Sequence, residues 1–202
     1  MKPRLITIAG GSGSGKSHLA RMLHHALSPQ ATVLTLDHFY HDLSHLTAAA
    51  RNDVNFDDPL AIDWQSASRV INDLLSNRST EIPIYDFVSH TRFPESNLLH
   101  PTLYIVLEGL WPLTNEAIRN GSLLSVFIDC PAEVRLQRRL QRDAVERGRS
   151  EESVRRQFCE HVAPMHEIHV QPQAQVSDLV LPHDFSEADI SSILAHPHFL
   201  AL

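Results

Sequence analysis

The chain has 202 residues, an ordinary length for one domain, and a formal net charge of −7. This charge disfavours a general binder of nucleic acid or of acidic membranes, because such proteins are usually basic. The two cysteines, Cys130 and Cys159, form no CxxC pair and match no metal-ligand spacing. The first apolar run is too short for a secretion signal or a membrane span. We therefore expect a cytoplasmic protein with no nucleic-acid or membrane partner.

Short apolar runs alternate with helical patterns along the whole chain. In chain order we expect strands over 5–9, 32–36, 103–107, 124–128 and 179–181, and an extended segment over 81–87. We expect helices over 16–27, 63–75, 131–146, 151–168 and 186–194, the fourth bent or broken near Pro164. Such alternation is typical of βαβ units, which build a parallel sheet. The sequence therefore predicts one α/β domain over 1–202.

A glycine-rich turn joins the first expected strand to the first expected helix. It matches the pattern G-x-x-x-x-G-K-[ST] with the residues Gly10, Gly11, Ser12, Gly13, Ser14, Gly15, Lys16 and Ser17. Glycines let the backbone turn tightly, so that several N–H groups point into one anion-binding concavity at a helix N-terminus. We expect Lys16 to bind the β- and γ-phosphates and Ser17 to offer its hydroxyl to Mg²⁺. The motif predicts a P-loop that binds a nucleoside triphosphate.

Two carboxylates, Asp37 and Glu108, follow expected strands directly. An acid at a strand end is most often a cap or a solvated loop residue. Ligands of open parallel sheets, however, bind beyond the C-terminal ends of the strands. Phosphoryl transfer needs a held Mg²⁺ and an oriented hydroxyl. Beside a P-loop, we expect these two acids to divide that work.

Four arginines lie on one face of the expected helix over 131–146, at i, i+3, i+4 and i+7: Arg135, Arg138, Arg139 and Arg142. A charged stripe is usually a solvated face. Charges of one sign repel each other, however, and favour bound anions. Next to a P-loop, this helix is suited to act as a lid that closes over phosphates and excludes water.

These segments together resemble the uridine kinases (uridine–cytidine kinases), within the wider uridine kinase and phosphoribulokinase group of P-loop kinases. The matching stretches are 10–17, DHFY (37–40), NFDDP (55–59), PIYDFVSHTR (83–92), LEG (107–109) and the arginine-rich segment 138–149. Weaker similarity continues from 157 to 182, so the resemblance covers about nine-tenths of the chain. It implies a three-layer P-loop fold with a helical lid at about 133–160 and a small extended nucleoside-binding insertion at about 80–104.

For the acceptor, the resemblance implies a nucleoside pocket. Asp37 would accept the proton of the 5′-hydroxyl, with Tyr40 nearby. Asp57 would bind both ribose hydroxyls, assisted by Arg139 and Gln157. The aromatic walls around the pyrimidine would be Phe56 and Phe87. The polar groups that read its edge would be Tyr85 and His90. The structural alternatives are a turn shaped by Asp57 and ordinary packing roles for the others.

For the donor, the resemblance implies ATP or GTP with Mg²⁺ as cofactor. Glu108 and Ser17 fit the Mg²⁺ side. Lys16 and Arg142 join Asp37 as catalytic residues, and the segment 147–149 contributes further donor contacts, from Arg147 and Arg149. The chain departs from the usual family residues at three places, Asp58, Ala163 and His183-Asp184. The last two lie toward the expected donor side, so the choice between ATP and GTP stays open.

The leading interpretation is a kinase that phosphorylates the 5′-hydroxyl of uridine or cytidine. One alternative is a kinase of another small alcohol, such as phosphoribulose, pantothenate or a different riboside; the segment 85–90 argues against it. Another is a non-catalytic nucleotide-binding switch, which would have no need for Asp37, Asp57 and the arginines together. The resemblance also implies that copies of the chain can associate as a homo-oligomer.

Overall fold

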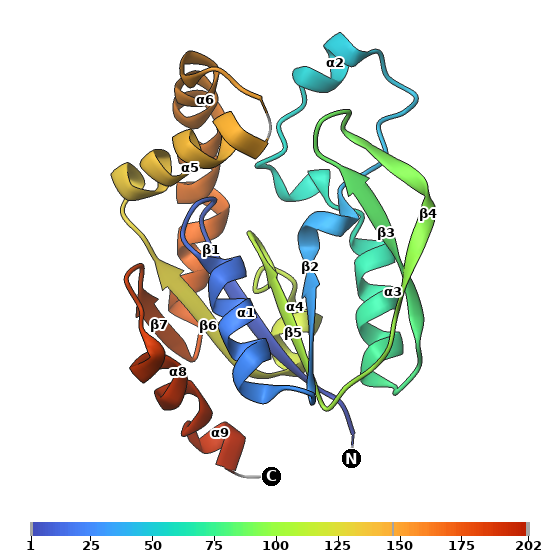
Figure 1. Cartoon of the computed structure of the whole chain (residues 1–202), viewed down its shortest axis with the longest axis vertical. Coiled ribbons are helices and arrows are strands. Elements are labelled where there is room, and N and C mark those ends of the chain that lie inside the picture. Colours follow the sequence, from blue (N-terminus) through green and yellow to red (C-terminus); the bar gives the residue numbers. More distant parts are fainter. Residues whose placement is uncertain (1, 147, 201–202) are drawn as a thin grey trace.

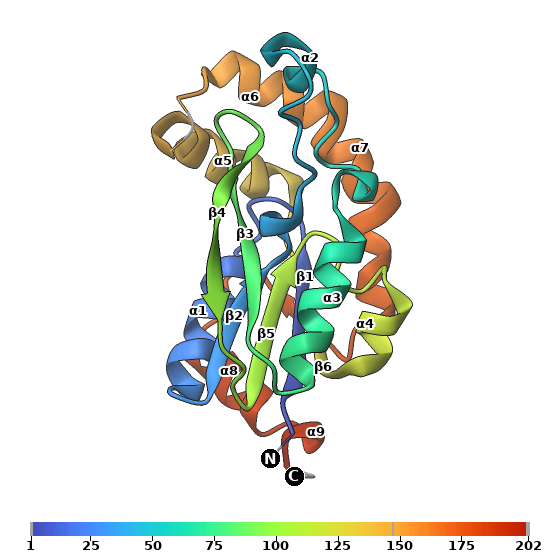
Figure 2. The same cartoon turned by 90° about the vertical axis from the view of Figure 1, so that its right-hand side faces the viewer.

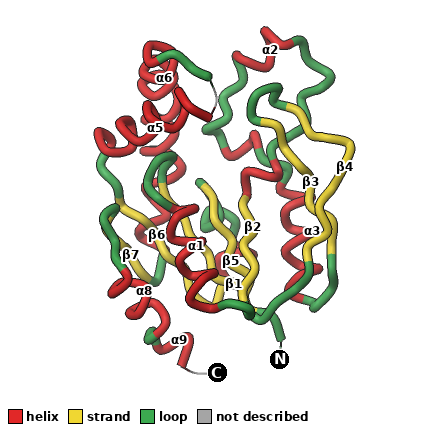
Figure 3. The backbone as a smooth tube through the Cα atoms, viewed as in Figure 1, coloured by secondary structure: helices red, strands yellow, loops and turns green. Residues whose placement is uncertain are grey.

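The computed structural model describes residues 2–146 and 148–200. Its centre is a five-stranded parallel sheet in the order β2-β5-β1-β6-β7 (Figures 1 and 3). The strands are β1 (Arg4–Gly10), β2 (Ala31–Thr35), β5 (Tyr104–Gly109), β6 (Ser122–Asp129) and β7 (Leu179–Pro182). The predicted parallel sheet is confirmed, with end positions that shift by roughly one or two residues.

Helices cover both faces of this sheet, so its central strands are apolar on both sides. In β1, Leu5 and Ala9 belong to one core, whereas Ile6 and Ile8 belong to the other. The first core packs under α3 (Trp64–Leu75) and α4 (Glu116–Gly121). The second packs under α1 (Lys16–Leu27), α8 (Glu187–Leu194) and α9 (Pro197–Leu200). Figure 2 displays these two helical layers on either side of the strands.

A separate two-stranded antiparallel sheet consists of β3 (Thr80–Asp86) and β4 (Thr91–Leu99). This hairpin lies beside α3 and extends past the carboxyl end of β2 (Figure 1). Periodicity predicted β3 as extended but not β4, although the extended insertion that the resemblance implies at about 80–104 includes both strands. Most of β4 is exposed, from Phe93 to Leu98, so it lacks the alternation of apolar and polar residues that identifies a half-buried strand.

A long helical region leads from β6 to β7. It begins with α5 (Ala132–Glu146) and α6 (Glu151–Gln157) and continues through π turns at 158–162 and 166–170 on either side of α7 (Ala163–Met165). A 3₁₀ helix, Gln171–Val176, ends it. Pro164 has no N–H to donate, and the wider π turns carry the helix past it without the predicted break. None of the described helices is long and apolar enough to cross a membrane.

Three short helices lead from β2 to α3, which precedes the hairpin: η1 (Leu36–Phe39), α2 (Ala48–Asn52) and η2 (Pro59–Ala61). In the fold, α2 and the hairpin turn lie on one side of the P-loop, opposite α5 and α6 (Figure 1). The functional site lies between these two sides.

Candidate active site

The P-loop connects β1 to α1 and folds tightly over the helix N-terminus. Gly13 and Gly15 have φ values of 84° and 106°, which side chains rarely adopt. A Cβ on Gly13 would also lie 2.7 Å from a backbone oxygen of α5. The amine of Lys16 turns back over the loop and donates to the carbonyl of Gly11 at 3.0 Å. The loop therefore presents backbone N–H groups and a lysine at one concave surface.

A cavity of about 620 Å³ opens above this loop. Most sequence-predicted site residues line it: Ser12, Gly13, Gly15, Lys16, Ser17, Asp37, Tyr40, Phe56, Asp57, Tyr85, Phe87, His90, Glu108, Arg139, Arg142, Arg149 and Gln157. Three predicted P-loop residues lie behind this lining: Gly10, Gly11 and Ser14. Arg147, predicted as a donor contact, falls outside the described residues. The fold thus collects residues from distant parts of the sequence in one place.

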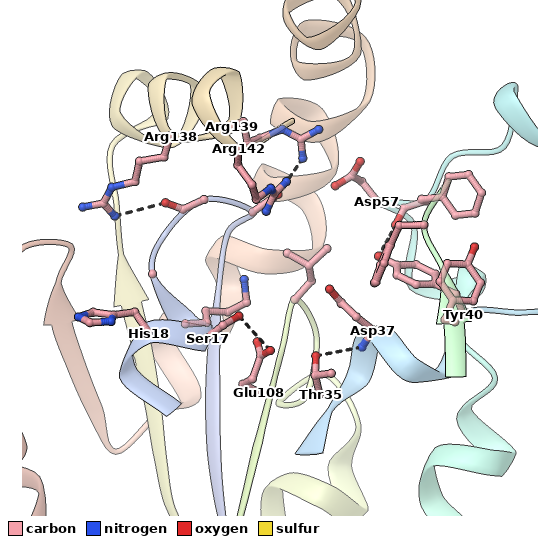
Figure 4. A pocket seen from close by; sticks show the side chains of 18 of the residues that line it. Ser17, His18, Thr35, Asp37, Tyr40, Asp57, Glu108, Arg138, Arg139 and Arg142 are labelled. Carbon is pink, nitrogen blue, oxygen red and sulfur yellow. Dashed lines mark hydrogen bonds between the residues drawn. The ribbon is translucent and has the colours of Figure 1, made fainter. Parts of the chain in front are cut away.

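The floor of the cavity contains a hydroxyl and a buried carboxylate. Ser17 Oγ donates to Glu108 Oε1 at 3.1 Å, and Glu108 is 6 % exposed (Figure 4). Burial raises the pKa of Glu108 above its usual value, while the nearby charge of Lys16 opposes that shift. Conversely, burial lowers the pKa of Lys16, and the charges of Glu108 and Asp37 counteract it. The two groups therefore stabilise each other's charged forms.

This floor fits a hard cation such as Mg²⁺. The donor set is all oxygen, and Mg²⁺ usually takes only one or two protein ligands and completes its shell with water and phosphate oxygens. The described residues contain no cluster of three or more His, Cys, Asp or Glu side chains suited to a metal. Ser17 and Glu108 are the residues that would hold the ion.

Asp37 lies in η1 rather than directly after β2 as predicted. The strand ends at Thr35, whose hydroxyl accepts a hydrogen bond from the Asp37 N–H at 3.2 Å and caps the short helix (Figure 4). This turn directs the chain away from the sheet, and Asp37 lines the cavity on the hairpin side of the P-loop. Thr35, which the sequence did not single out, also lines the cavity.

Aromatic rings form the hairpin side of the cavity. Tyr40 lies at the centre, with ring centroids 5.7 Å from Phe56, 5.3 Å from Tyr85 and 6.5 Å from Phe87. Its hydroxyl donates to the carbonyl of Phe56 at 3.1 Å. His90 stacks on Phe56 at 4.2 Å, and its Nδ1 lies 3.4 Å from the Tyr85 hydroxyl. These rings form an aromatic wall of the cavity, which we call the aromatic slot, with the His90 imidazole and the Tyr85 hydroxyl as polar groups.

His90 adopts a left-handed backbone conformation with φ of 56° at the turn of the hairpin. Such a conformation costs energy in a non-glycine residue and needs support from its surroundings. Asp86 supplies it, because its carboxylate accepts from the N–H groups of Val88 and Ser89 and from the Ser89 hydroxyl. The imidazole is therefore held in a defined orientation.

The turn that contains Asp57 is organised by its neighbours. Asn55 accepts from the Asp57 N–H at 3.1 Å, and Asp58 caps η2 by accepting from the Leu60 N–H at 2.8 Å. The Asp57 carboxylate instead points into the space between the arginines and Tyr40 (Figure 4). Asp57 is 8 % exposed and lines the cavity. The turn-forming roles thus belong to Asn55 and Asp58.

The opposite side of the cavity is an arginine network. Arg139 donates to Ser12 Oγ at 2.7 Å and to Gln157 Oε1 at 2.8 Å, and Arg149 donates to the same Gln157 oxygen at 2.6 Å. Asp143, which is fully buried, forms ion pairs with Arg139 and with Arg142, whose Nη2 lies 2.7 Å from its Oδ1. The arginines are therefore oriented groups of a packed surface rather than a solvated stripe.

Arg138 extends this network to the far end of the P-loop. Its Nη1 donates to the carbonyls of Gly13 and Ser14, and its Nη2 donates to the carbonyl of His183 at 3.1 Å. The sequence predicts Arg138 in the stripe without a ligand, and it predicts no role for Asp143. The available signal is the spacing, because Asp143 follows Arg139 by four positions, which places the two side chains on one helix face.

The amino-acid sequence matches a family model over most of its length. Residues 5–191 match the model described as Phosphoribulokinase / Uridine kinase family. The chain belongs to this family. It is 40 % identical to a uridine kinase of Deinococcus deserti over 91 % of this chain and 89 % of that one. It is 39 % identical to a uridine kinase of Halobacterium salinarum over 88 % of this chain and 79 % of that one.

The fold matches as well. A phosphoribulokinase structure from Rhodobacter spheroides aligns with a TM-score of 0.66 at 17 % identity, over 90 % of this chain and 70 % of that one. As a member of the phosphoribulokinase and uridine kinase family, the protein is a kinase that transfers a phosphoryl group to an alcohol. Such kinases use ATP as donor with Mg²⁺.

Proposed function

We propose that this kinase is a uridine–cytidine kinase, which transfers the γ-phosphoryl group of ATP or GTP to the 5′-hydroxyl of uridine or cytidine. The observation that carries the proposal is the aromatic slot, because it opens into the same cavity as the P-loop and Asp37. The uridine kinases of Deinococcus deserti and Halobacterium salinarum support it. A phosphorylated sugar or a small acid would have no use for four aromatic rings and an imidazole.

In this proposal, the 5′-hydroxyl oxygen of the nucleoside forms a bond to the γ-phosphorus while Asp37 takes the hydroxyl proton. The bond from the γ-phosphorus to the β–γ bridging oxygen breaks in the same step. Lys16 and Arg142 bind the phosphate oxygens on which charge is concentrated. Mg²⁺, held by Ser17 and Glu108 when bound, neutralises phosphate charge and helps to align the donor. Arg147 and Arg149 would add donor contacts. The products are the nucleoside 5′-monophosphate and the nucleoside diphosphate.

The nucleoside is oriented by both sides of the cavity. Asp57 binds the ribose hydroxyls with Arg139 and Gln157, the last already paired with Arg149 in this structure. The rings of Phe56 and Phe87 enclose the pyrimidine. Tyr85 and His90 read its edge, and Tyr40 lies nearby in the same pocket.

A panel of acceptors and donors on the purified protein tests the proposal. Uridine and cytidine should give the highest kcat/KM among ribosides, phosphoribulose, pantothenate and small sugar acids, with ATP or GTP as donor. Preferred phosphorylation of phosphoribulose or another non-nucleoside would identify a different kinase on the same P-loop fold. Nucleotide hydrolysis that no acceptor accelerates would identify a switch.

A further inference from the structure

Arg135 is the largest fully buried charged side chain of the described structure, and it lies behind the P-loop rather than in the cavity. Only 2 % of it is exposed, and it is absent from the cavity lining. Its Nε donates to the carbonyl of Cys130 at 3.1 Å, and its guanidinium carbon lies 5.5 Å from the centroid of the Phe158 ring. These contacts fix the side chain, but neither supplies a negative charge.

The charge of Arg135 is not paired with any carboxylate in the described part of the chain, and Glu167, Asp129 and Asp57 act on it only through longer-range electrostatics. Its buried Nη1 has no hydrogen-bond acceptor in that part of the chain. Burial lowers the pKa of this guanidinium, although arginine stays protonated in proteins. A buried cation without a partner is strongly unfavourable, so its presence calls for an anion that binds nearby.

The P-loop packs directly against this cation. A Cβ on Gly11 would lie 2.7 Å from Arg135 Cδ and 3.0 Å from its Nη1. From the cavity, Lys16 reaches the same glycine, because its Nζ donates to the Gly11 carbonyl. The first half of the loop therefore lies between two cations, one in front of the backbone and one behind it.

His166 completes the layer behind the loop. Its Nε2 lies 2.9 Å from Gln171 Oε1, and the Gln171 amide donates to Asp129, which fixes the amide orientation. His166 therefore donates from Nε2 and keeps Nδ1 as an acceptor, 2.8 Å from the position of a Gly11 Cβ. Burial and then the charge of Arg135 lower the pKa of His166, so the ring is neutral near pH 7 and adds no repulsion.

We propose that Arg135 is a positioning residue for the donor phosphates, a charge fixed behind the P-loop whose counter-charge is the triphosphate bound in front. The inference rests on the proposed function, because it needs donor phosphates in the loop. Arg135 acts through the loop backbone, where the low dielectric keeps the attraction strong. Two unit charges about 10 Å apart at an effective dielectric of about 20 change an affinity roughly tenfold. The contribution of Arg135 to nucleotide affinity therefore grows with the negative charge of the phosphates.

The test measures the affinities of AMP, ADP and ATP by calorimetry in the parent protein, in two uncharged variants, Arg135→Met and Arg135→Gln, and in Arg135→Lys. Arg156→Met, at an exposed arginine of α6, is the matched control. We expect the uncharged variants to lose little AMP affinity and progressively more for ADP and ATP, at least about tenfold for ATP. Arg135→Lys should retain most of the phosphate dependence, and KM for uridine should stay within about twofold in every variant, since uridine carries no charge.

Equal losses for AMP, ADP and ATP, or no loss for ATP, would overturn the inference while the proposed function stands. Failure of both uncharged variants to fold, judged by circular dichroism, would also overturn it, because Arg135 would then be a structural residue. If the parent protein binds no nucleotide, the proposed function fails and this inference with it.

Discussion

The rings of Phe56 and His90 stack with centroids 4.2 Å apart and an angle of 15° between their planes. The first residue precedes η2, and the second lies in the turn between β3 and β4, so the stack joins two segments that are separate in the chain. Because His90 also approaches the Tyr85 hydroxyl, the stack fixes the position of the polar groups of the aromatic slot.

Purine ribosides should be poor acceptors, because a two-ring base overfills a slot bounded by this stack. We expect kcat/KM for adenosine and guanosine to be at least about tenfold below that for uridine. His90→Asn keeps a residue that tolerates the left-handed backbone but removes the ring, and it should lower uridine kcat/KM roughly tenfold. Val88→Ala, at an exposed position of the same turn, is the control. Adenosine used as efficiently as uridine would show that the slot does not read the base.

The ribose prediction concerns Asp57. A site that bonds a hydroxyl rejects the analogue without it, because its own buried polar groups are left unpaired, and losses of up to about 10⁴-fold are reasonable. 2′-Deoxyuridine should therefore be a much worse acceptor than uridine. Asp57→Ala should reduce kcat/KM for uridine far more than for 2′-deoxyuridine.

Asp58→Ala is the matched control for that comparison, because Asp58 caps η2 and should affect only stability, by about 1 kcal/mol. Both nucleosides are measured with the parent enzyme and with each variant. If the parent uses uridine and 2′-deoxyuridine equally, Asp57 is not a ribose ligand.

Asp37→Asn should lower kcat by roughly 10²–10⁴-fold with a smaller change in donor binding, since the amide can bond the 5′-hydroxyl but cannot take its proton. Asp42→Asn is the control, because the Asp42 carboxylate bonds Ser44 and the Arg92 N–H outside the cavity. Steady-state kinetics and calorimetry of donor binding separate the two effects. A kcat for Asp37→Asn within about threefold of the parent would exclude Asp37 as the base.

The Mg²⁺ requirement should increase as the pH falls. Burial raises the pKa of Glu108, so the carboxylate takes up a proton at a higher pH than a free glutamate does, and the protonated form is a poor ligand. We expect the Mg²⁺ concentration for half-maximal activity to rise as the pH is lowered toward the ordinary pKa of a glutamate, and to begin rising at a higher pH than an unperturbed glutamate would give. Glu108→Gln should need more Mg²⁺ throughout and show a flatter pH profile. A flat profile in the parent would contradict a role for Glu108 at the metal.

The parallel sheet and the P-loop could be predicted from local sequence patterns, because both depend on local rules. A buried strand is a continuous apolar run, and the loop needs glycines, one lysine and one hydroxyl at fixed spacing before a helix. The resemblance in the segment 83–92 likewise named aromatic residues that line the cavity in the structure, among them Tyr85 and Phe87.

The surroundings of each arginine of α5 follow from packing between elements that are distant in the sequence. Helical spacing places Arg135 and Arg139 on one face of α5, yet the first is sealed behind the P-loop and the second reaches Ser12 and Gln157. Their different surroundings come from β1, α6 and the π turns, which are distant in sequence. Periodicity alone did not predict the hairpin strand β4 for a related reason: it is fixed by pairing with β3, while its own side chains are mostly solvated. Periodicity records which residues are buried, but the partner that buries each one is set by long-range packing.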